Sequence, residues 1–449
     1  MLRLYDTALG KVAQLELREP GRLSMYVCGP TVYDEPHIGH GRFTIIWDVL
    51  RRYAAFSGLD VDFVSNVTDI EDKIIARAAA EGRTPEEVAD HYEKVWWDIQ
   101  DRLGVQRPSE TPHATGYVED MVQLIGELIA SGHAYVGGDG VYFAAESIDG
   151  YGLLARQPID SLRAGARVEA GEEAGKRSPI DFVLWKFAKP GEPKWRSPWG
   201  DGRPGWHTEC VVMSLDLLGE GFDLHGGGLD LAFPHHENER AQAVGAGQRF
   251  ARRWVHSGMV TAEGGEKMSK SLGNTLSLSE LVSTHDPRAF RLQVLQSHYR
   301  SPLEVTEASL AAAAAGVERL DAFAREFSGS RGRPADQEAM GRFRDRMDDD
   351  LDTPGAVAIA FDLIRDARAA DGERSTAKAA AVFEIFEQAL GLPLRDVVEE
   401  APAEALAKAA ERDRARAAKD WARADALRSE LQAEGWIVED GPDGTTIRR

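Results

Sequence analysis

The chain has 449 residues, of which 43% are hydrophobic and 28% are charged, and it carries a formal net charge of −21. This composition is typical of a globular protein of two to four domains, and the negative charge argues against a general nucleic-acid coating protein. The sequence has no apolar run of about 18 residues and no basic N-terminal segment that leads into an apolar one. We therefore expect a cytosolic protein without a membrane span.

The first part of the chain alternates between predicted strands and helices. Residues 23–33 predict a buried strand that ends in a Gly-Pro loop, and residues 38–58 show the apolar spacing of a helix. A second strand over 60–69 leads into a second helix over 70–82. This order favours a parallel sheet, whose ligands bind beyond the carboxyl ends of the strands.

Residues 113–200 predict an insertion into this pattern, with a helix, a short hairpin and a stretch rich in Gly, Pro and Trp. The α/β pattern then resumes with a helix over 206–219, a strand that enters a glycine loop over 222–228, and a helix that begins near Pro234.

The carboxyl-terminal third predicts a different architecture. From about residue 306 the alanine-rich composition favours a helical bundle, with breaks at 328–334 and 352–356. The last fifty residues predict a small module of one further helix over 415–435, a strand over 436–440 and a turn.

The segment PHIGH places His37 and His40 at the turn between the first strand and the first helix. Gly39 would let a ligand approach the backbone closely, and the amides and dipole of the helix would face an anion. Both imidazoles could donate hydrogen bonds to phosphate oxygens that gain charge during a displacement at phosphorus. Taken alone, such a short pattern also fits ordinary polar turn residues.

The segment EKMSKSLGN, residues 266–274, carries Lys267 and Lys270 on a loop flanked by glycines. Two ammonium groups there could hold a triphosphate, and Lys270 is the better candidate for stabilising charge on departing pyrophosphate. A solvated basic loop is the alternative reading. Together, the HIGH and KMSKS segments of a βαβ-type chain resemble the signature of class I aminoacyl-tRNA synthetases, which activate an amino acid with ATP.

Only two cysteines are present, so a disulfide framework is excluded. Cys28 follows the first strand and Cys210 lies on a later helix, while His235 and Glu239 stand four positions apart and face the same way. Two thiolates, an imidazole and a carboxylate are a competent set of zinc ligands with room for an exogenous ligand. The alternatives are two inert buried thiols, or a site in which a neighbouring histidine replaces His235: His207 or His236.

Five segments together resemble the motifs of cysteinyl-tRNA synthetases, and the likeness runs over nearly the whole chain. They are CGPTVYDEPHIGHGR, NVTDIEDKI, GWHTEC, DLHGGGLDLAFPHHENE and EKMSKSLGN. The resemblance implies an α/β fold with a class I synthetase Rossmann-type nucleotide-binding core and an insertion, followed by an α-helical bundle and a small C-terminal α/β module. The implied domains are the two halves of the catalytic domain (1–112 and 201–255), the insertion (113–200), the KMSKS loop and stem-contact region (256–305), the bundle (306–400) and the anticodon-binding module (401–449).

The resemblance also implies a role for each matching residue. One zinc ion per chain would be held by Cys28, Cys210, His235 and Glu239. Mg²⁺ would accompany ATP, whose matching residues are His37, Gly39, His40, Asp223, His225, Gly226, Lys267 and Lys270, with the two PHIGH histidines and the two lysines as the catalytic groups. The residues that match contacts to cysteine are Gly29, Thr31, Thr68 and Trp206, and those that match contacts to the anticodon are Arg428, Trp436 and Asp440.

Some of these residues also have purely structural readings. Trp206 could be a core aromatic, Thr68 could cap the helix that follows it, and a tight turn alone would explain the glycines. Ile447 stands where the family leads us to expect tryptophan, which puts one stacking contact in doubt.

The two cysteines and the other proposed zinc ligands have a physical purpose in such an enzyme. Cysteine and serine differ by sulfur against oxygen, and the shape of a cavity separates such near-isosteres by only about 10-fold to 200-fold. A zinc ion stabilises a bound thiolate far better than a hydroxyl, so discrimination would occur during binding. The substrate thiol is expected to complete the coordination of the metal.

The resemblance implies a ligase that activates L-cysteine with ATP and transfers it from cysteinyl adenylate to the 3′-terminal adenosine of tRNA(Cys). The partners would be ATP, L-cysteine and tRNA(Cys), and we expect a monomer that does not bind membranes. One alternative is the cysteine ligase of mycothiol biosynthesis, which joins cysteine to an amino sugar but belongs to a family that looks shorter at its carboxyl end. A second alternative is a non-catalytic zinc- and nucleotide-binding RNA protein.

Overall fold

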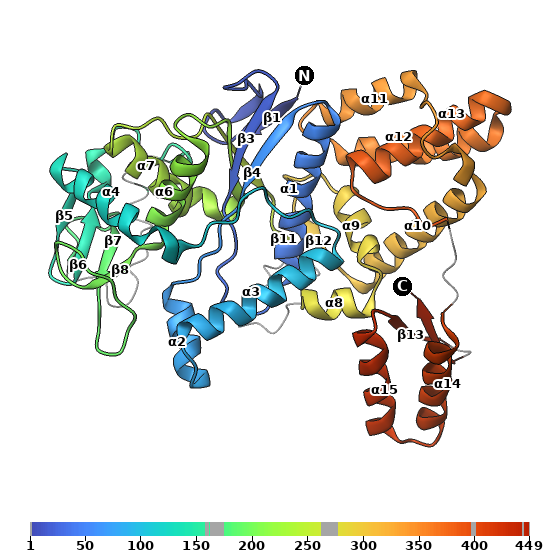
Figure 1. Cartoon of the computed structure of the whole chain (residues 1–449). Helices are drawn as coiled ribbons and strands as arrows, with labels where there is room; N and C mark the ends of the chain where they lie inside the picture. The colour runs from blue at the N-terminus through green and yellow to red at the C-terminus, as the bar shows by residue number, and fades with distance from the viewer. Residues whose placement is uncertain are drawn as a thin grey trace.

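The computed structural model describes residues 2–157, 161, 175–261, 277–396, 401–441 and 444–448, and a four-stranded parallel sheet lies near its centre (Figure 1). The strand order is β10 (Arg253–Ser257), β9 (Leu224–Gly228), β3 (Arg22–Val27) and β4 (Asp60–Val64). All three pairings are parallel. The predicted α/β class and its parallel sheet are therefore confirmed.

Helix α1 (Ile38–Phe56) connects β3 to β4, as predicted for residues 38–58. Alternate side chains of a strand point to opposite faces of its sheet, so β3 contributes to two different cores. Leu23, Met25 and Val27 pack into the core that contains α1 and the helical bundle. Tyr26 and Cys28 belong to the core on the other face, which contains the insertion and α6 (Trp206–Leu218). This alternation turns the Cys28 thiol toward α6.

Between β4 and α6, the part of the chain that the structure describes forms three α-helices and a second sheet. The helices are α2 (Asp72–Glu81), α3 (Pro85–Arg102) and α4 (Val118–Ala130). The strands β5 (Ala134–Val136), β6 (Gly140–Phe143), β7 (Phe182–Phe187) and β8 (Gly202–Pro204) pair antiparallel in that order. The predicted hairpin is thus only half of a four-stranded sheet.

Glycines explain how β8 joins this sheet. A Cβ at Gly202 would lie 2.2 Å from the Lys186 carbonyl oxygen, and one at Gly205 would lie 2.3 Å from that of Val183. Only residues without a side chain let the backbone approach β7 so closely. The sequence did not reveal β8 because these glycines and the surrounding prolines interrupt the alternation that marks a strand.

Past α6 and β9, the chain forms a π-helical turn, η4 (Ala232–His236), and then α7 (Glu237–Gly245). After β10, two short strands pair parallel, β11 (Val260–Thr261) and β12 (Leu303–Glu304), and between them lie α8 (Leu278–Thr284) and α9 (Pro287–Leu295). An antiparallel hairpin of β1 (Arg3–Asp6) and β2 (Lys11–Gln14) begins the described chain. The predicted helices over 206–219 and from Pro234 are confirmed.

The predicted helical bundle is present. It consists of α10 (Glu307–Glu326), α11 (Gln337–Met347), α12 (Thr353–Ala369) and α13 (Gly372–Phe383), which runs on into the π-helical segment η8 (Glu384–Ala389). Figure 1 shows these helices together on the side of α1 that faces away from the insertion. The predicted break at 352–356 is the start of α12, where Asp352 caps the helix and Pro354 occupies its first turn.

The C-terminal module differs from its prediction, because two helices stand where one was expected. They are α14 (Ala403–Ala417) and α15 (Trp421–Ala433), followed by a hairpin of β13 (Ile437–Gly441) and β14 (Gly444–Arg448). Lys419 adopts a left-handed backbone, with φ of 62°, and Asp420 then caps α15 by accepting a hydrogen bond from the Arg423 amide. Such a turn ends one helix and begins the next.

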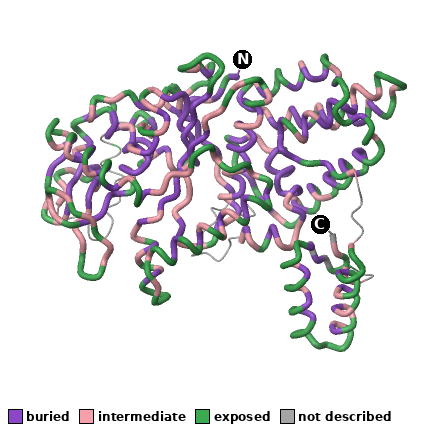
Figure 2. The backbone as a smooth tube through the Cα atoms, viewed as in Figure 1, coloured by how far each residue is buried: buried purple, intermediate pink, exposed green. Residues whose placement is uncertain are grey.

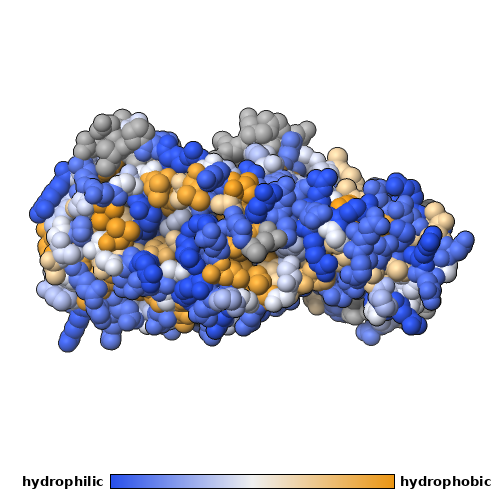
Figure 3. All heavy atoms as spheres, turned by 90° about the horizontal axis from the view of Figure 1, so that it is seen from above, coloured by the Kyte–Doolittle hydropathy of each residue, from blue (hydrophilic) through white to orange (hydrophobic). Residues whose placement is uncertain are grey.

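Burial follows this division into cores. Figure 2 shows buried residues along the central sheet, α1, α6 and the inward sides of the bundle, with exposed residues on the outer turns. The face shown in Figure 3 is largely hydrophilic, with apolar residues in separate groups. Among the described helices, none combines the length and the apolar character needed to cross a membrane.

The close packing of α1 on the sheet can be tested by a substitution at Gly226. A Cβ there would lie 2.4 Å from Cη2 of Trp47, which is 1% exposed. We predict that Gly226→Ala lowers the free energy of unfolding by about 1–3 kcal/mol, because the buried indole must shift to make room.

Urea denaturation followed by fluorescence measures this change. The control is Gly341→Ala in α11, where no heavy atom lies within 4 Å of the added Cβ. For Gly341→Ala we expect the free energy of unfolding to rise by up to about 1 kcal/mol, because alanine has the higher helix propensity. If Gly226→Ala left the free energy of unfolding unchanged, this would contradict the close packing of Gly226 on Trp47.

Candidate functional site

Four potential metal ligands meet near the carboxyl end of β3. Cys28 directly follows β3, Cys210 lies on α6, His235 lies in η4 and Glu239 lies on α7. Their ligand atoms all lie within 4.8 Å of one another, and all four residues are buried. The structure thus brings together the four residues that the sequence proposed.

The individual distances leave a common space between these side chains. Sγ of Cys28 lies 3.6 Å from Sγ of Cys210 and 3.5 Å from Oε1 of Glu239. Nε2 of His235 lies 3.7 Å from Sγ of Cys210 and 3.0 Å from Oε1 of Glu239. We call these four residues the thiol cluster.

A second set of residues shares two members of the thiol cluster. Cys28 and Glu239 also lie with His225 and His236 in a group that meets the same distance limit. Nε2 of His236 lies 3.3 Å from Sγ of Cys28, and Nε2 of His225 lies 2.7 Å from Oε2 of Glu239. Of the two alternatives to His235, His236 is therefore near enough to serve, whereas His207 contacts His235 itself.

The pKa values of the thiol-cluster residues are consistent with a cation bound between them. Burial raises the pKa of the Cys28 thiol well above its ordinary range, and it also raises the pKa values of Cys210 and Glu239. Burial lowers the pKa of His235 well below its usual value, which leaves the imidazole neutral and able to bind a metal. A divalent cation would stabilise the thiolates and the carboxylate that burial disfavours, so the residues present fit a metal ion.

Surrounding side chains hold the ligands in place. Nδ1 of His207 lies 2.7 Å from Nδ1 of His235, and the ring of Trp206 stacks on that of His235 with centroids 4.0 Å apart. Second contacts of this kind fix the orientation of a ligating imidazole. Trp206 is 39% exposed, so one part of its ring covers the thiol cluster while another faces outward.

The residues proposed to contact the amino acid form a connected network beside the thiol cluster. Thr31 and Thr68 lie side by side in a parallel bridge. The Gly29 amide donates to Oδ1 of Asn66, and Nδ2 of Asn66 donates to Oγ1 of Thr68. The Thr68 hydroxyl in turn donates to Oε2 of Glu209, so it does not cap the following helix, whose N-cap is Glu71.

Sequence reasoning missed Asn66 and Glu209. Both are buried, and Oε1 of Glu209 has no hydrogen-bond partner among the described residues. Burial, together with three neighbouring carboxylates, raises the pKa of Glu209 well above its ordinary value. Their positions, within NVTD and next to Cys210 in GWHTEC, were the available signal.

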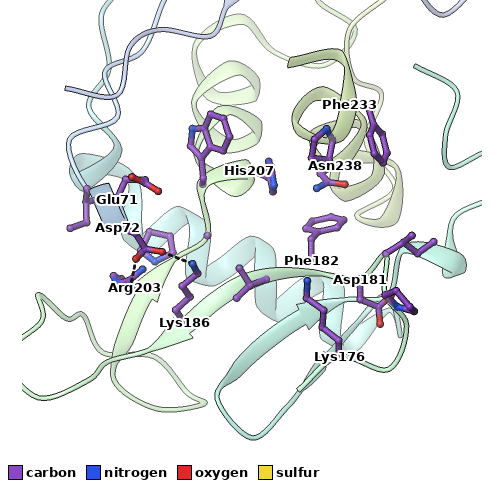
Figure 4. Close-up of a pocket in the computed structure, with 18 of the residues that line it drawn as sticks. Glu71, Asp72, Lys176, Asp181, Phe182, Lys186, Arg203, His207, Phe233 and Asn238 are labelled. Carbon is purple, nitrogen blue, oxygen red and sulfur yellow. Dashed lines mark hydrogen bonds and ion pairs between the residues drawn. The ribbon is translucent and has the colours of Figure 1, made fainter. Parts of the chain in front are cut away.

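A pocket of about 580 Å³ opens beside Trp206 and His207 (Figure 4). It lies between the start of α6, the η4–α7 segment and the sheet of the insertion. Figure 4 shows Asp72 bonded to both Lys186 and Arg203 at one end of this pocket, at 2.7 Å and 2.5 Å. The pocket thus connects the outside with the aromatic cover of the thiol cluster.

The two histidines of PHIGH form the start of α1. His37 is the N-cap, and its Nδ1 accepts a hydrogen bond from the Gly39 amide at 3.1 Å. Nδ1 of His40 accepts one from the His37 amide, also at 3.1 Å, and the two rings stack with centroids 3.8 Å apart. Because Nδ1 is an acceptor in both neutral rings, the proton resides on Nε2, which makes each ring a donor there.

The other residues proposed for ATP binding have mixed positions. Asp223 precedes β9 at the amino end of the sheet, where its carboxylate accepts hydrogen bonds from Ser24 and Arg18. His225 is fully buried and bonded to Glu239, and Gly226 packs on Trp47. For Asp223 this location is at odds with the prediction, because ligands of parallel sheets bind at the opposite edge. Lys267 and Lys270 lie outside the described residues.

The anticodon residues proposed from the sequence also differ in exposure. Trp436 is 3% exposed and packs in the core of the C-terminal module, with Ile447 at its edge. Asp440 forms ion pairs with Arg412 and Arg416, and Arg428 on α15 is half-buried. A buried indole offers no face for stacking, so the position of Trp436 does not favour a base contact.

The module has another aromatic residue that the sequence analysis did not select. Trp421 begins α15 and is 59% exposed. Lys419 lies two residues before it, and Arg414 in the last turn of α14 adds positive charge to this end of the helix pair, whereas Arg416 is paired with Asp440. The signal available in the sequence was a tryptophan close to basic residues, in a chain whose net charge is −21.

Three family descriptions match successive parts of the chain. Residues 14–315 match "tRNA synthetases class I (C) catalytic domain", residues 342–395 match the DALR domain, and residues 399–448 match "Cysteinyl-tRNA ligase anticodon binding domain". Solved structures share the fold at low identity. Methionyl-tRNA synthetase of Mycobacterium tuberculosis in complex with methionyl-adenylate aligns over 82% of this chain and 89% of its own, with a TM-score of 0.57 and 16% identity.

The LeuRS of Agrobacterium radiobacter K84, solved with tRNA and LeuAMS, covers 84% of each chain with a TM-score of 0.61 and 12% identity. Curated relatives are much more similar in sequence. The cysteine–tRNA ligase of Halorhodospira halophila is 45% identical over 100% of both chains. That of Thermus thermophilus is 44% identical over 100% of this chain and 99% of its own. The chain therefore belongs to the cysteine–tRNA ligase family of class I tRNA synthetases.

Proposed function

We propose that the protein activates L-cysteine with ATP to form cysteinyl adenylate and transfers the cysteinyl group to the 3′-terminal adenosine of tRNA(Cys). The observation that carries the amino-acid specificity is the thiol cluster, which is buried and whose His235 stacks against Trp206, a residue that lines the pocket. Membership of the family supports the reaction itself.

Zinc is the metal that suits this set of ligands, since it binds two thiolates, an imidazole and a carboxylate in tetrahedral sites. When bound, zinc would supply a soft Lewis acid that favours the thiol of cysteine over the hydroxyl of serine. The protein contributes the orientation of the site, because His207 holds His235 and Trp206 covers it. Gly29, Thr31, Thr68 and Trp206 then surround the rest of the amino acid.

The PHIGH histidines act on the phosphates of ATP. Their Nε2 donors and the amino end of α1 stabilise negative charge that grows on the α-phosphate as the cysteine carboxylate attacks it. The carboxylate oxygen forms a bond to phosphorus while the bond to pyrophosphate breaks. Lys267 and Lys270 offset the charge on pyrophosphate, and Mg²⁺ accompanies ATP as in other phosphoryl-group chemistry.

The acceptor is tRNA in this proposal. The C-terminal residues match an anticodon-binding module, and the relatives that span the full chain are cysteine–tRNA ligases. The amino-sugar ligase considered from the sequence is therefore not favoured.

Cysteine-dependent exchange of labelled pyrophosphate into ATP tests the proposed function, together with charging of a tRNA transcript that bears the GCA anticodon. We expect both activities. Exchange without charging would move the acceptor to an amino sugar or another amine. No exchange by zinc-loaded protein would refute the proposal.

Substitution of a residue in the thiol cluster should weaken the selection of cysteine over serine. Cys210→Ser should lower kcat/KM for cysteine in pyrophosphate exchange by more than about 10-fold, because a metal ligand is lost. Selection against serine should shrink toward the roughly 10-fold to 200-fold range that the shape of a cavity provides.

The control for this experiment is Ser214→Ala. Ser214 is buried one turn further along α6, and this variant should keep both the kcat/KM for cysteine and the selection against serine. Metal content is measured by atomic absorption on each protein. Undiminished serine rejection by Cys210→Ser would contradict a role for the thiol cluster in selection.

Trp421 predicts a second, separable effect. Loss of a base-stacking contact worth about 1–3 kcal/mol should raise the KM for tRNA by about 5-fold to 150-fold in Trp421→Ala. Pyrophosphate exchange should stay unchanged, since it needs no tRNA. Leu406→Ala removes an equally exposed apolar side chain from α14 and should leave the KM as it is. A matching effect of both variants would argue against stacking at Trp421.

A further inference from the structure

Arg42 is buried at the start of α1 without a carboxylate partner. It lies two residues after His40 and is 1% exposed. Among the described residues no aspartate or glutamate forms an ion pair with it. Burial alone lowers the pKa of its guanidinium to about 10.

Five backbone carbonyl groups surround this guanidinium. Nη1 donates to the carbonyl oxygens of Gly258 and Met259, at 3.0 Å and 2.8 Å. Nη2 donates to three more, which belong to His298, Tyr299 and Ser301. An unpaired buried charge is strongly unfavourable, and only an arrangement that gathers carbonyl dipoles so closely can compensate for it.

The carbonyl groups come from two segments that Arg42 joins. Gly258 and Met259 directly follow β10, and residues 298–301 lie between α9 and β12. The Gly258 amide donates to the Tyr299 carbonyl at 2.8 Å, so the two segments also contact each other. A Cβ at Gly258 would lie 2.5 Å from the carbonyl oxygens of Arg300 and Ser301. The junction therefore requires both a glycine and an arginine.

This junction lies between two structures that the proposed function places beside ATP. The amino end of α1 carries His37 and His40, and the carboxyl end of β10 belongs to the edge where parallel sheets bind ligands. Because a guanidinium has a rigid fork of five donors, it can bond both segments at a fixed separation. A displaced α1 would carry both imidazoles away from the strand end.

We propose that Arg42 is a positioning residue for adenylate formation, which fixes the amino end of α1 against the carboxyl end of β10. This inference rests on the proposed function, because it concerns the step in which ATP reacts. Arg42 contacts neither the thiol cluster nor the pocket residues. A substitution of Arg42 should therefore lower the rate of the reaction and leave the binding of cysteine unchanged.

Arg42→Lys tests this role in the full-length, zinc-loaded protein. Lysine keeps the charge, but its three donors radiate from one point and cannot hold both segments. We expect kcat for cysteine-dependent pyrophosphate exchange to fall by about 100-fold, as a misplacement of about 1 Å does. The KM for cysteine should stay unchanged, and so should the cysteine affinity measured from thiolate-to-cobalt absorption in the Co²⁺ form.

Arg291→Lys is the matched control. Arg291 is also 1% exposed, and it ties α9 to Asp48, further along the same α1. This variant should lose thermal stability and yet keep kcat at temperatures well below its unfolding midpoint. A merely structural Arg42 would give the same pattern as Arg291, with full kcat in the folded protein, and that result would overturn the proposal.

Gly258→Ala approaches the junction from the other side. The added Cβ should widen the junction and lower kcat with an unchanged KM for cysteine, without altering any charge. Full kcat in both Gly258→Ala and Arg42→Lys would overturn the positioning role alone. If the wild-type protein itself shows no exchange, the proposed function fails, and the inference fails with it.

Discussion

Exclusion of water from the thiol cluster is the constraint on which the rest of the site depends. Two thiols, an imidazole and a carboxylate that are all buried favour their neutral forms, so the cluster is unfavourable as a set of bare anions and favourable around a cation. The fold supplies this burial from both sides. Strand β3 turns Cys28 toward α6, and Trp206 covers the opposite side of His235.

The central sheet separates the two tasks of the enzyme. On the α6 face lie the four residues of the thiol cluster, which we propose to select the side chain of the amino acid. On the α1 face lie His37 and His40, whose tautomer is set by the capping geometry of the helix and whose position Arg42 secures. In the proposed function, the selection of the amino acid and the attack on ATP therefore take place at the carboxyl edge of the same strands. Residues 401–441 and 444–448 form a module with a core of its own, so contacts to tRNA there can vary without changing either face.

Much of this could be predicted from the sequence, because strand and helix periodicity and the motif residues are local signals. The meeting of Cys28, Cys210, His235 and Glu239 was predictable through the family pattern and the i, i+4 spacing of His235 and Glu239. What could not be predicted depends on tertiary contacts. The left-handed turn at Lys419 interrupts the helix expected over 415–435, and Asp223 lies at the sheet edge opposite the ligand side. The burial of Trp436 likewise results from packing that no local pattern encodes.

Zinc K-edge X-ray absorption of the purified protein, with and without cysteine, tests the central claim most directly. The account predicts a first shell with two sulfur atoms at about 2.3 Å and two lighter atoms at about 2.0–2.2 Å in the free protein. Addition of cysteine should bring the number of sulfur atoms to three, and addition of serine should leave it at two. A shell that contains no sulfur, or one that cysteine at saturating concentration does not change, would contradict the claim that the thiol cluster selects the substrate through a metal ion.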